Sequence, residues 1–133
     1  MIRAVADTHA LIWYLFEDKS LSRVAKQFMD NTAKEGDQIG FSAITTVELV
    51  YLIEKGKINP ETLTRLSQAT ENEDAAFVEI PVTGAIAQKM SSISRESIPD
   101  MPDRIIAATA LSLNLPVISR DGKIKVSRMK TIW

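Results

Sequence analysis

The sequence predicts an α/β protein, a three-layer α/β/α sandwich around a mostly parallel central sheet. Short apolar runs alternate with segments of helical periodicity along the chain. Helical crossovers between parallel strands place helices on both faces of a sheet. No repeat, low-complexity tract or Pro/Gly/Ser-rich linker interrupts the 133 residues. We therefore expect a single domain over residues 1–133.

In the first half of the chain, the apolar runs Ile2–Ala6 and Gln38–Ala43 are expected to be strands. A helix is expected between them, ending before Gly36. The apolar residues that recur there at helical spacing are Leu21, Val24, Ala25, Phe28 and Met29. Another helix is expected to open at Thr45 and to run to about Lys55, ahead of a glycine.

In the second half, Asn59 and Pro60 are typical of a helix start, because Asn caps helices and Pro is favoured at the first helical position. Phe77–Val82 is expected to be the third strand, and Thr83 is expected to cap the helix after it. The remaining expected elements are an apolar helix over Asp103–Asn114, a strand over Pro116–Ser119 and an edge strand over Lys130–Trp133.

Composition excludes several classes of protein. The chain is 45% hydrophobic and 25% charged, which is ordinary for a soluble globular protein. It has no cysteine, so disulfides, thiolate nucleophiles and sulfur-based zinc sites are excluded. Apolar stretches such as Ile105–Leu113 are too short to cross a bilayer, and the N-terminus lacks the features of a signal peptide. We expect a cytoplasmic protein without membrane contact.

Charge is distributed unevenly, although the formal net charge is only −1. From residue 104 onward there is one acid, Asp121, and the basic residues are Arg104, Arg120, Lys123, Lys125, Arg128 and Lys130. This asymmetry is compatible with a basic rim that faces phosphates. On charge alone, a solvated face is the preferred explanation.

Four acidic residues are expected at one edge of the sheet. Asp7 follows the first strand, Glu48 lies in the first turn of a helix, Asp103 begins a helix and Asp121 follows the fourth strand. Helix N-termini and strand C-termini meet at the same edge of such a sheet, where ligands bind. Carboxylates gathered there raise one another's pKa or recruit cations. Carboxylate oxygens suit Mg²⁺, which also binds substrate phosphates.

Each acid also has a structural explanation. Asp7 can cap the helix that starts at Thr8, and Asp103 can complement a helix dipole. Glu48 with Thr45 fits a T-x-x-E capping box, and Asp121 before a glycine fits a hairpin turn. The convergence of all four at one edge favours an active site.

At these residues the sequence resembles the PIN-domain family, and within it the VapC-like toxins of bacterial toxin–antitoxin pairs. The resemblance covers essentially the whole chain and consists of four motifs. Each motif is weak alone, but the four in this order are highly specific. The motifs are Val5–Trp13 with its Asp-Thr-His, Ser42–Leu49 with Glu48, Asp100–Ala110 with Asp103, and Ser119–Ile124 with Asp121. Members often have Asp-Pro-Phe-Asp in the third motif, where this chain has Asp-Met-Pro-Asp.

The resemblance implies a compact α/β/α sandwich and a homodimer. It implies Mg²⁺- or Mn²⁺-dependent endoribonuclease activity on RNA, and inhibition by a small antitoxin protein.

Roles are assigned as hypotheses. Asp7 is the central metal ligand, and Asp103 and Asp121 complete the coordination directly or through water. Glu48 binds metal or orients the attacking water. Thr8 and Ser119 hold the carboxylates in place, or are ordinary caps.

Three further features have two readings each. His9 is read as structural rather than as a general base, and Asp100 as a helix cap rather than a metal ligand. Arg104, Arg120 and Lys123 either steer phosphates or balance the acidic charge. The apolar stripe Leu11, Ile12, Leu15, with Trp13 and Tyr14 around it, either packs in the core or lines a dimer or antitoxin groove.

Two rival functions remain open at this point. The same acids could serve a DNA nuclease or phosphohydrolase, because metal-assisted displacement at phosphorus serves all these substrates. The chain could also be a non-catalytic module that binds RNA or represses transcription with a partner.

Overall fold

The computed structural model describes residues 1–122, 124 and 129–133, and its fold is the predicted α/β sandwich. The sheet has five strands, all parallel, in the order β3-β2-β1-β4-β5. The strands are β1 (Ile2–Ala6), β2 (Gln38–Ser42), β3 (Phe77–Ile80), β4 (Val117–Ile118) and β5 (Thr131–Ile132). All five lie where an apolar run predicts a strand, and β5 is at an edge as expected.

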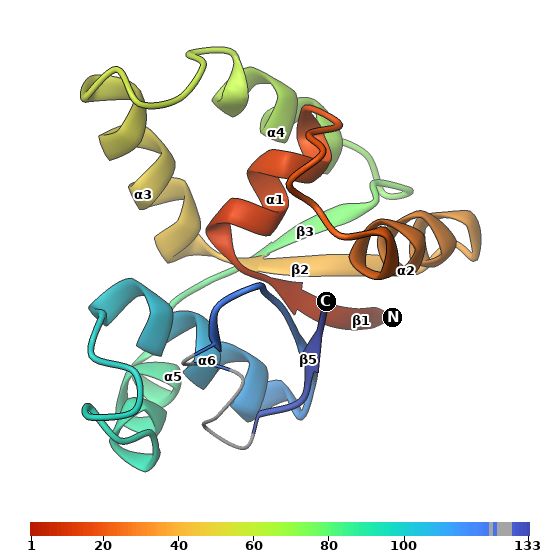
Figure 1. Ribbon diagram of the computed structural model, residues 1–133. Coiled ribbons are helices and arrows are strands. Elements are labelled where there is room, and N and C mark those ends of the chain that lie inside the picture. Colours follow the sequence, from red (N-terminus) through yellow and green to blue (C-terminus); the bar gives the residue numbers. More distant parts are fainter. Residues whose placement is uncertain (123, 125–128) are drawn as a thin grey trace.

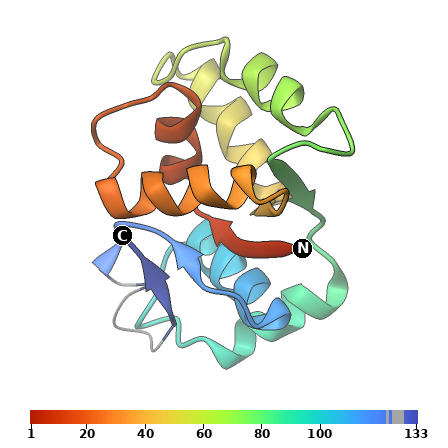
Figure 2. The ribbon, with the colours of Figure 1, turned by 90° about the vertical axis from the view of Figure 1, so that its right-hand side faces the viewer.

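Helices cover both faces of the sheet (Figures 1 and 2). The helices are α1 (Thr8–Leu15), α2 (Arg23–Lys34), α3 (Ala43–Glu54), α4 (Thr62–Thr70), α5 (Gly84–Lys89) and α6 (Met101–Leu113), with a 3-10 turn η1 (Met90–Ser92) after α5. In Figure 1, α1 and α4 lie above the sheet and α5 and α6 lie below it. The starts of α1 and α3 lie beside the carboxyl end of β1 in the same view.

Each face of the sheet carries its own apolar core, because side chains alternate along a strand. In β1, Ala4 and Ala6 pack toward α1, α2 and α4, whereas Val5 packs toward α5 and α6. Phe41 and Leu49 belong to the first core, and Ile106 belongs to the second. Strands buried on both faces read as continuous apolar runs, which is why the sequence identifies them.

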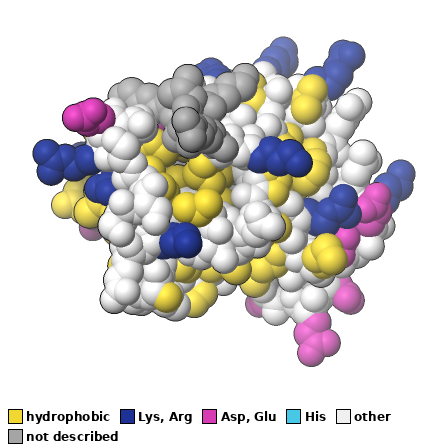
Figure 3. All heavy atoms as spheres, turned by 90° about the horizontal axis from the view of Figure 1, so that it is seen from below, with side chains coloured by type: hydrophobic (Ala, Val, Ile, Leu, Met, Phe, Trp, Pro, Cys, Tyr) yellow, Lys and Arg dark blue, Asp and Glu magenta, His cyan; other side chains and the backbone are white. Residues whose placement is uncertain are grey.

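The surface on the side of α5 and α6 is mixed in character. Figure 3 shows apolar atoms at its centre and scattered Lys and Arg side chains around them. Within the ranges 1–122, 124 and 129–133, none of the helices combines the length and hydrophobicity needed to cross a membrane.

Several predicted boundaries are wrong by a few residues. Strand β2 ends at Ser42, whose hydroxyl accepts a hydrogen bond of 3.1 Å from the backbone N–H of Ile44, so α3 starts at once. Thr45 therefore lies inside the helix, and the predicted capping box of Thr45 and Glu48 does not form. Glu48 is in the second turn of α3 rather than the first.

Two other predictions from the sequence are also wrong, one about a helix start and one about a turn. The segment after Asn59 forms a turn before α4, since the Asn59 carbonyl accepts from the N–H of Thr62 at 3.0 Å. Asp121 and Gly122 do not form a hairpin turn, because β4 and β5 are parallel and cannot be joined by one.

Candidate active site

A cleft of about 390 Å³ opens at the carboxyl end of the sheet. It lies beyond β1 and β4 and beside the first turns of α1 and α6, and α3 forms another side. The residues that line it are Asp7, Thr8, His9, Trp13, Glu48, Asp100, Asp103, Arg120 and Asp121. All four acids singled out in the sequence therefore line one cleft, together with a fifth, Asp100.

Asp7 directly follows β1 and is 8% exposed. Its Oδ1 accepts a hydrogen bond of 2.8 Å from the backbone N–H of Ala10, so it caps α1. Burial raises the pKa of Asp7, while hydrogen bonds from Ser119 and Ala10 lower it. Capping and facing the cleft are thus properties of the same side chain, and the two readings do not compete.

Glu48 reaches the cleft from the second turn of α3. Its Oε1 accepts a hydrogen bond of 2.6 Å from the Thr8 hydroxyl, and that hydroxyl lies 3.0 Å from the hydroxyl of Thr45. Burial raises the pKa of Glu48; the Thr8 bond opposes this, and the charge of Asp100 adds to it. The fully buried Thr45 belongs to this chain of contacts and is not the helix cap that the sequence predicts.

Asp103 has the most perturbed carboxyl of the cleft. Burial, followed by the charges of Asp100, Asp121, Glu48 and Asp7, raises the pKa of Asp103 to about 7. Four neighbouring carboxylates act on one group, which shows that the acids lie near enough to interact electrostatically. Asp100 caps α6, because its Oδ2 accepts from the backbone N–H of Asp103 at 3.1 Å.

Ser119 connects two of the acids. Its hydroxyl accepts a hydrogen bond of 2.9 Å from the backbone N–H of Asp121, and a hydrogen bond with Ser119 also lowers the pKa of Asp7. Ser119 is 1% exposed. The loop after β4 is therefore held against the end of β1 by a buried hydroxyl.

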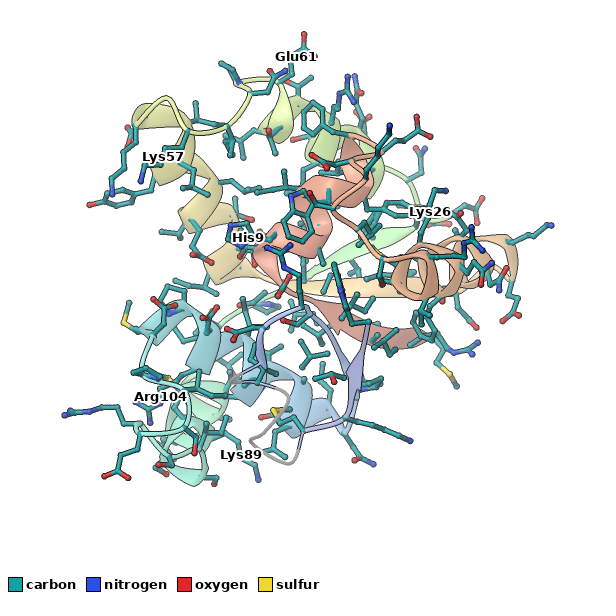
Figure 4. All side chains as sticks on the ribbon, viewed as in Figure 1. His9, Lys26, Lys57, Glu61, Lys89 and Arg104 are labelled. Atoms are coloured by element: carbon teal, nitrogen blue, oxygen red, sulfur yellow. The ribbon has the colours of Figure 1, made fainter. Side chains whose placement is uncertain are left out.

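The three basic residues expected either to steer phosphates or to balance the acidic charge differ in their positions. Arg120 lines the cleft. Arg104 does not, because its Nη2 donates to the backbone carbonyls of Met90 at 2.9 Å and Ile93 at 3.1 Å. Figure 4 places Arg104 beside α5 and His9 at the start of α1. The prediction for Arg104 is therefore corrected to a structural role, and Lys123 lies outside the described residues.

Aromatic contacts, which were not predicted from the sequence, form one side of the cleft. The Trp13 ring lies 5.6 Å from the His9 ring and 5.9 Å from the Trp133 ring, measured between centroids. The Arg120 guanidinium carbon lies 4.8 Å from the Trp13 centroid. Only the spacing of His9 and Trp13, one helical turn apart, signals any of this in the sequence.

The cleft has the oxygen donors that a hard divalent cation prefers. In the part of the chain that the structure describes, no three Asp, Glu or His side chains are already arranged around a common metal position. The donor chemistry nevertheless fits, because a cation would relieve the carboxylate repulsion that adds to burial in raising the pKa of Asp103. Asp7, Asp103, Asp121 and Glu48 are the carboxylates predicted from the sequence to hold such a cation, and all four line the cleft.

The chain belongs to the PIN-domain family, whose pattern matches residues 4–128. No curated protein matches it.

Several solved structures are similar to it over nearly the whole chain. One is VapBC2 from Rickettsia felis bound to a DNA fragment from their promoter (TM-score 0.71, 17% identity, 98% of this chain and 97% of that chain). Another is a toxin–antitoxin complex from Klebsiella pneumoniae (TM-score 0.62, 29% identity, 98% and 96%). A third is FitAcB from Neisseria gonorrhoeae (TM-score 0.62, 22% identity, 98% and 96%). These likenesses support the fold, and a nuclease role agrees with the family.

Proposed function

We propose that this protein is a divalent-metal-dependent endoribonuclease and the toxin of a toxin–antitoxin pair acting in the cytoplasm. The observation that carries the proposal is the acidic cleft: carboxylates from four separate segments meet there, and their charges together with burial raise the pKa of Asp103 to about 7. Such a cluster of carboxylates destabilises the fold through like-charge repulsion, whereas a bound cation would stabilise it.

In the proposed reaction, Asp7, Asp103 and Asp121 hold Mg²⁺ or Mn²⁺, and Glu48 binds metal or orients the attacking water. When bound, the cation would polarise a phosphate oxygen and favour ionisation of water. The hydrogen bonds from Thr8 to Glu48 and from Ala10 to Asp7 keep these carboxylates oriented before substrate arrives.

The test is cleavage of a labelled RNA at increasing Mg²⁺ and Mn²⁺ concentrations. We expect metal-dependent internal cleavage that is lost in Asp7→Asn and retained in Asp30→Asn, a matched change on α2 outside the cleft. Full activity in Asp7→Asn would refute the proposal. Equal hydrolysis of DNA or of a phosphomonoester would favour the first rival function, and RNA binding without cleavage would favour the non-catalytic module.

The antitoxin part of the proposal is supported by the toxin–antitoxin neighbours and by a hollow of about 650 Å³ between α1, α2 and α4. Tyr14 and Leu15 of the predicted stripe line it, whereas Leu11 is fully buried in the core. We expect a short neighbouring reading frame to encode a DNA-binding protein with a disordered tail that binds there. Leu15→Asp should weaken the complex without changing RNA cleavage, and unchanged binding would exclude this hollow.

A further inference from the structure

One wall of the acidic cleft is aromatic and basic. It consists of His9, Trp13 and Arg120, which we call the stacking wall. His9 and Arg120 are exposed, while Trp13 is half-buried and packs against the core under α1. The contacts of 5.6 Å between the His9 and Trp13 rings and 4.8 Å between Arg120 and Trp13 place both exposed groups on one indole.

The stacking wall is held from behind. Trp133, directly after β5, contacts Trp13 at 5.9 Å between ring centroids. The Ser119 hydroxyl holds the backbone N–H of Asp121 and so fixes the loop that carries Arg120. The wall is therefore built by three distant segments rather than by one exposed side chain.

Arg120 is distinctive in its choice of partner. Five acids line the same cleft, yet none of the ion pairs between described residues involves Arg120. Its guanidinium instead lies over the Trp13 ring. This cation–π contact holds the Arg120 side chain without a hydrogen bond to a carboxylate. Arg120 lines the cleft that is proposed to receive a phosphodiester.

We propose that the stacking wall binds an unpaired base of the RNA next to the scissile phosphate. The inference rests on the proposed nuclease function. Bases splayed out of a helix stack on imidazole, indole and guanidinium planes, whereas bases in a duplex keep their faces covered. His9 and Arg120 contact the base, and Trp13 is a positioning residue that holds both.

The experiment measures binding of a labelled single-stranded RNA, of the same strand in a perfect duplex, and of a strand with one abasic nucleotide at each position in turn. Full-length protein carrying Asp7→Asn is used so that the RNA stays intact. We expect Arg120→Lys and Trp13→Leu to weaken single-strand binding about tenfold, the scale of one lost stacking contact. Trp13→Phe should restore it, and duplex binding should change little.

The decisive measurement is the affinity for the series of strands that carry one abasic nucleotide each. At one position, removal of the base should weaken binding to the Asp7→Asn protein and have no further effect on Arg120→Lys. Arg65→Lys is the matched control, because Arg65 lies over the Phe16 ring at 4.1 Å, away from the cleft. Equal tolerance of every abasic position would overturn the inference, and so would tighter binding of duplex.

The two failures are distinguishable. If wild-type protein cleaves RNA in the presence of metal but the abasic series is flat, the stacking wall alone is excluded. If the abasic series shows one sensitive position but wild-type protein never cleaves, the nuclease proposal fails while the base contact stands. Should Trp13→Leu not fold, Arg120→Lys and the abasic strands still decide the outcome.

Discussion

The hydroxyl of Thr8 donates a hydrogen bond of 2.6 Å to the carboxylate of Glu48, joining the first turn of α1 to the second turn of α3. Two residues 40 positions apart are thereby fixed at one cleft. The bond matters because burial alone would raise the pKa of Glu48, and Thr8 opposes that effect.

Replacement of Thr8 by Val removes this donor while keeping the shape of the side chain. We expect the free energy of unfolding to fall by about 1–2 kcal/mol, because a buried acceptor loses its partner. We expect metal-dependent cleavage to fall as well, with the lower limb of its pH profile moved upward as the pKa of Glu48 rises. Thr46→Val is the control, since Thr46 makes the same 2.6 Å bond to an exposed carboxylate, that of Glu79. Identical pH profiles for Thr8→Val and wild type would contradict the prediction.

Asp103 is expected to make the metal-free protein less stable as pH rises. Its folded pKa of about 7 exceeds the ordinary value of 3.8, so between these values the folded protein holds a proton that the unfolded chain releases. The contribution of Asp103 to stability therefore falls from pH 4 to pH 7 and stays low above it. At pH 8 without divalent cations, Asp103→Asn should be more stable than wild type by about 1–2 kcal/mol, after allowance for solvent screening of this partly exposed group. Urea unfolding at pH 4 and pH 8 measures it, and a difference that does not depend on pH would refute it.

Added Mg²⁺ or Mn²⁺ should reverse that instability. A cation that binds only the folded protein adds about 1.4 kcal/mol at ten times its Kd. We expect the midpoint of thermal unfolding to rise with Mg²⁺ concentration at pH 8 in wild type, and to rise much less in Asp103→Asn. An equal rise in both proteins would locate the cation elsewhere.

Arg104 is expected to act on stability and not on RNA. Its guanidinium donates hydrogen bonds to the backbone carbonyls of Met90, at the start of η1, and of Ile93, directly after η1. Arg104→Gln should lower the free energy of unfolding by about 1–3 kcal/mol, the usual scale for a charged donor lost from partly buried acceptors. RNA affinity and its salt dependence should match wild type, measured at a temperature where the variant is folded. A weaker salt dependence would instead support phosphate steering by Arg104, one of the two readings that the sequence leaves open.

Much of the architecture can be predicted from the sequence, for a specific physical reason. A parallel sheet covered on both faces requires mostly apolar strands, and Ile2–Ala6 and Phe77–Ile80 each contain only one charged residue, so they can be recognised from this sequence alone. The acids follow from the same logic, since a residue such as Asp7 that ends a buried strand must lie at the carboxyl edge. Helix starts were less accurate, because Ser42 and Thr45 are both good caps and only the fold selects between them.

Long-range contacts were not predictable in this way. Nothing local distinguishes Arg104, which binds backbone carbonyls, from Arg120, which lies over an indole. The contact between Trp13 and Trp133 joins residues that are far apart in the sequence, and no periodic pattern predicts it. Parallel pairing of β4 with β5 likewise overrides the Asp-Gly hairpin signal.

Asp7 both caps α1 and lines the acidic cleft, and this combination determines how the proposed activity can be removed. Asparagine caps a helix as well as aspartate does but carries no negative charge. A single exchange at this position is thus expected to yield a properly folded molecule that still recognises its partners and has lost its chemistry. Replacement of one carboxylate oxygen by nitrogen can therefore separate the proposed nuclease activity from the fold, a route by which a lineage could keep the scaffold without its chemistry.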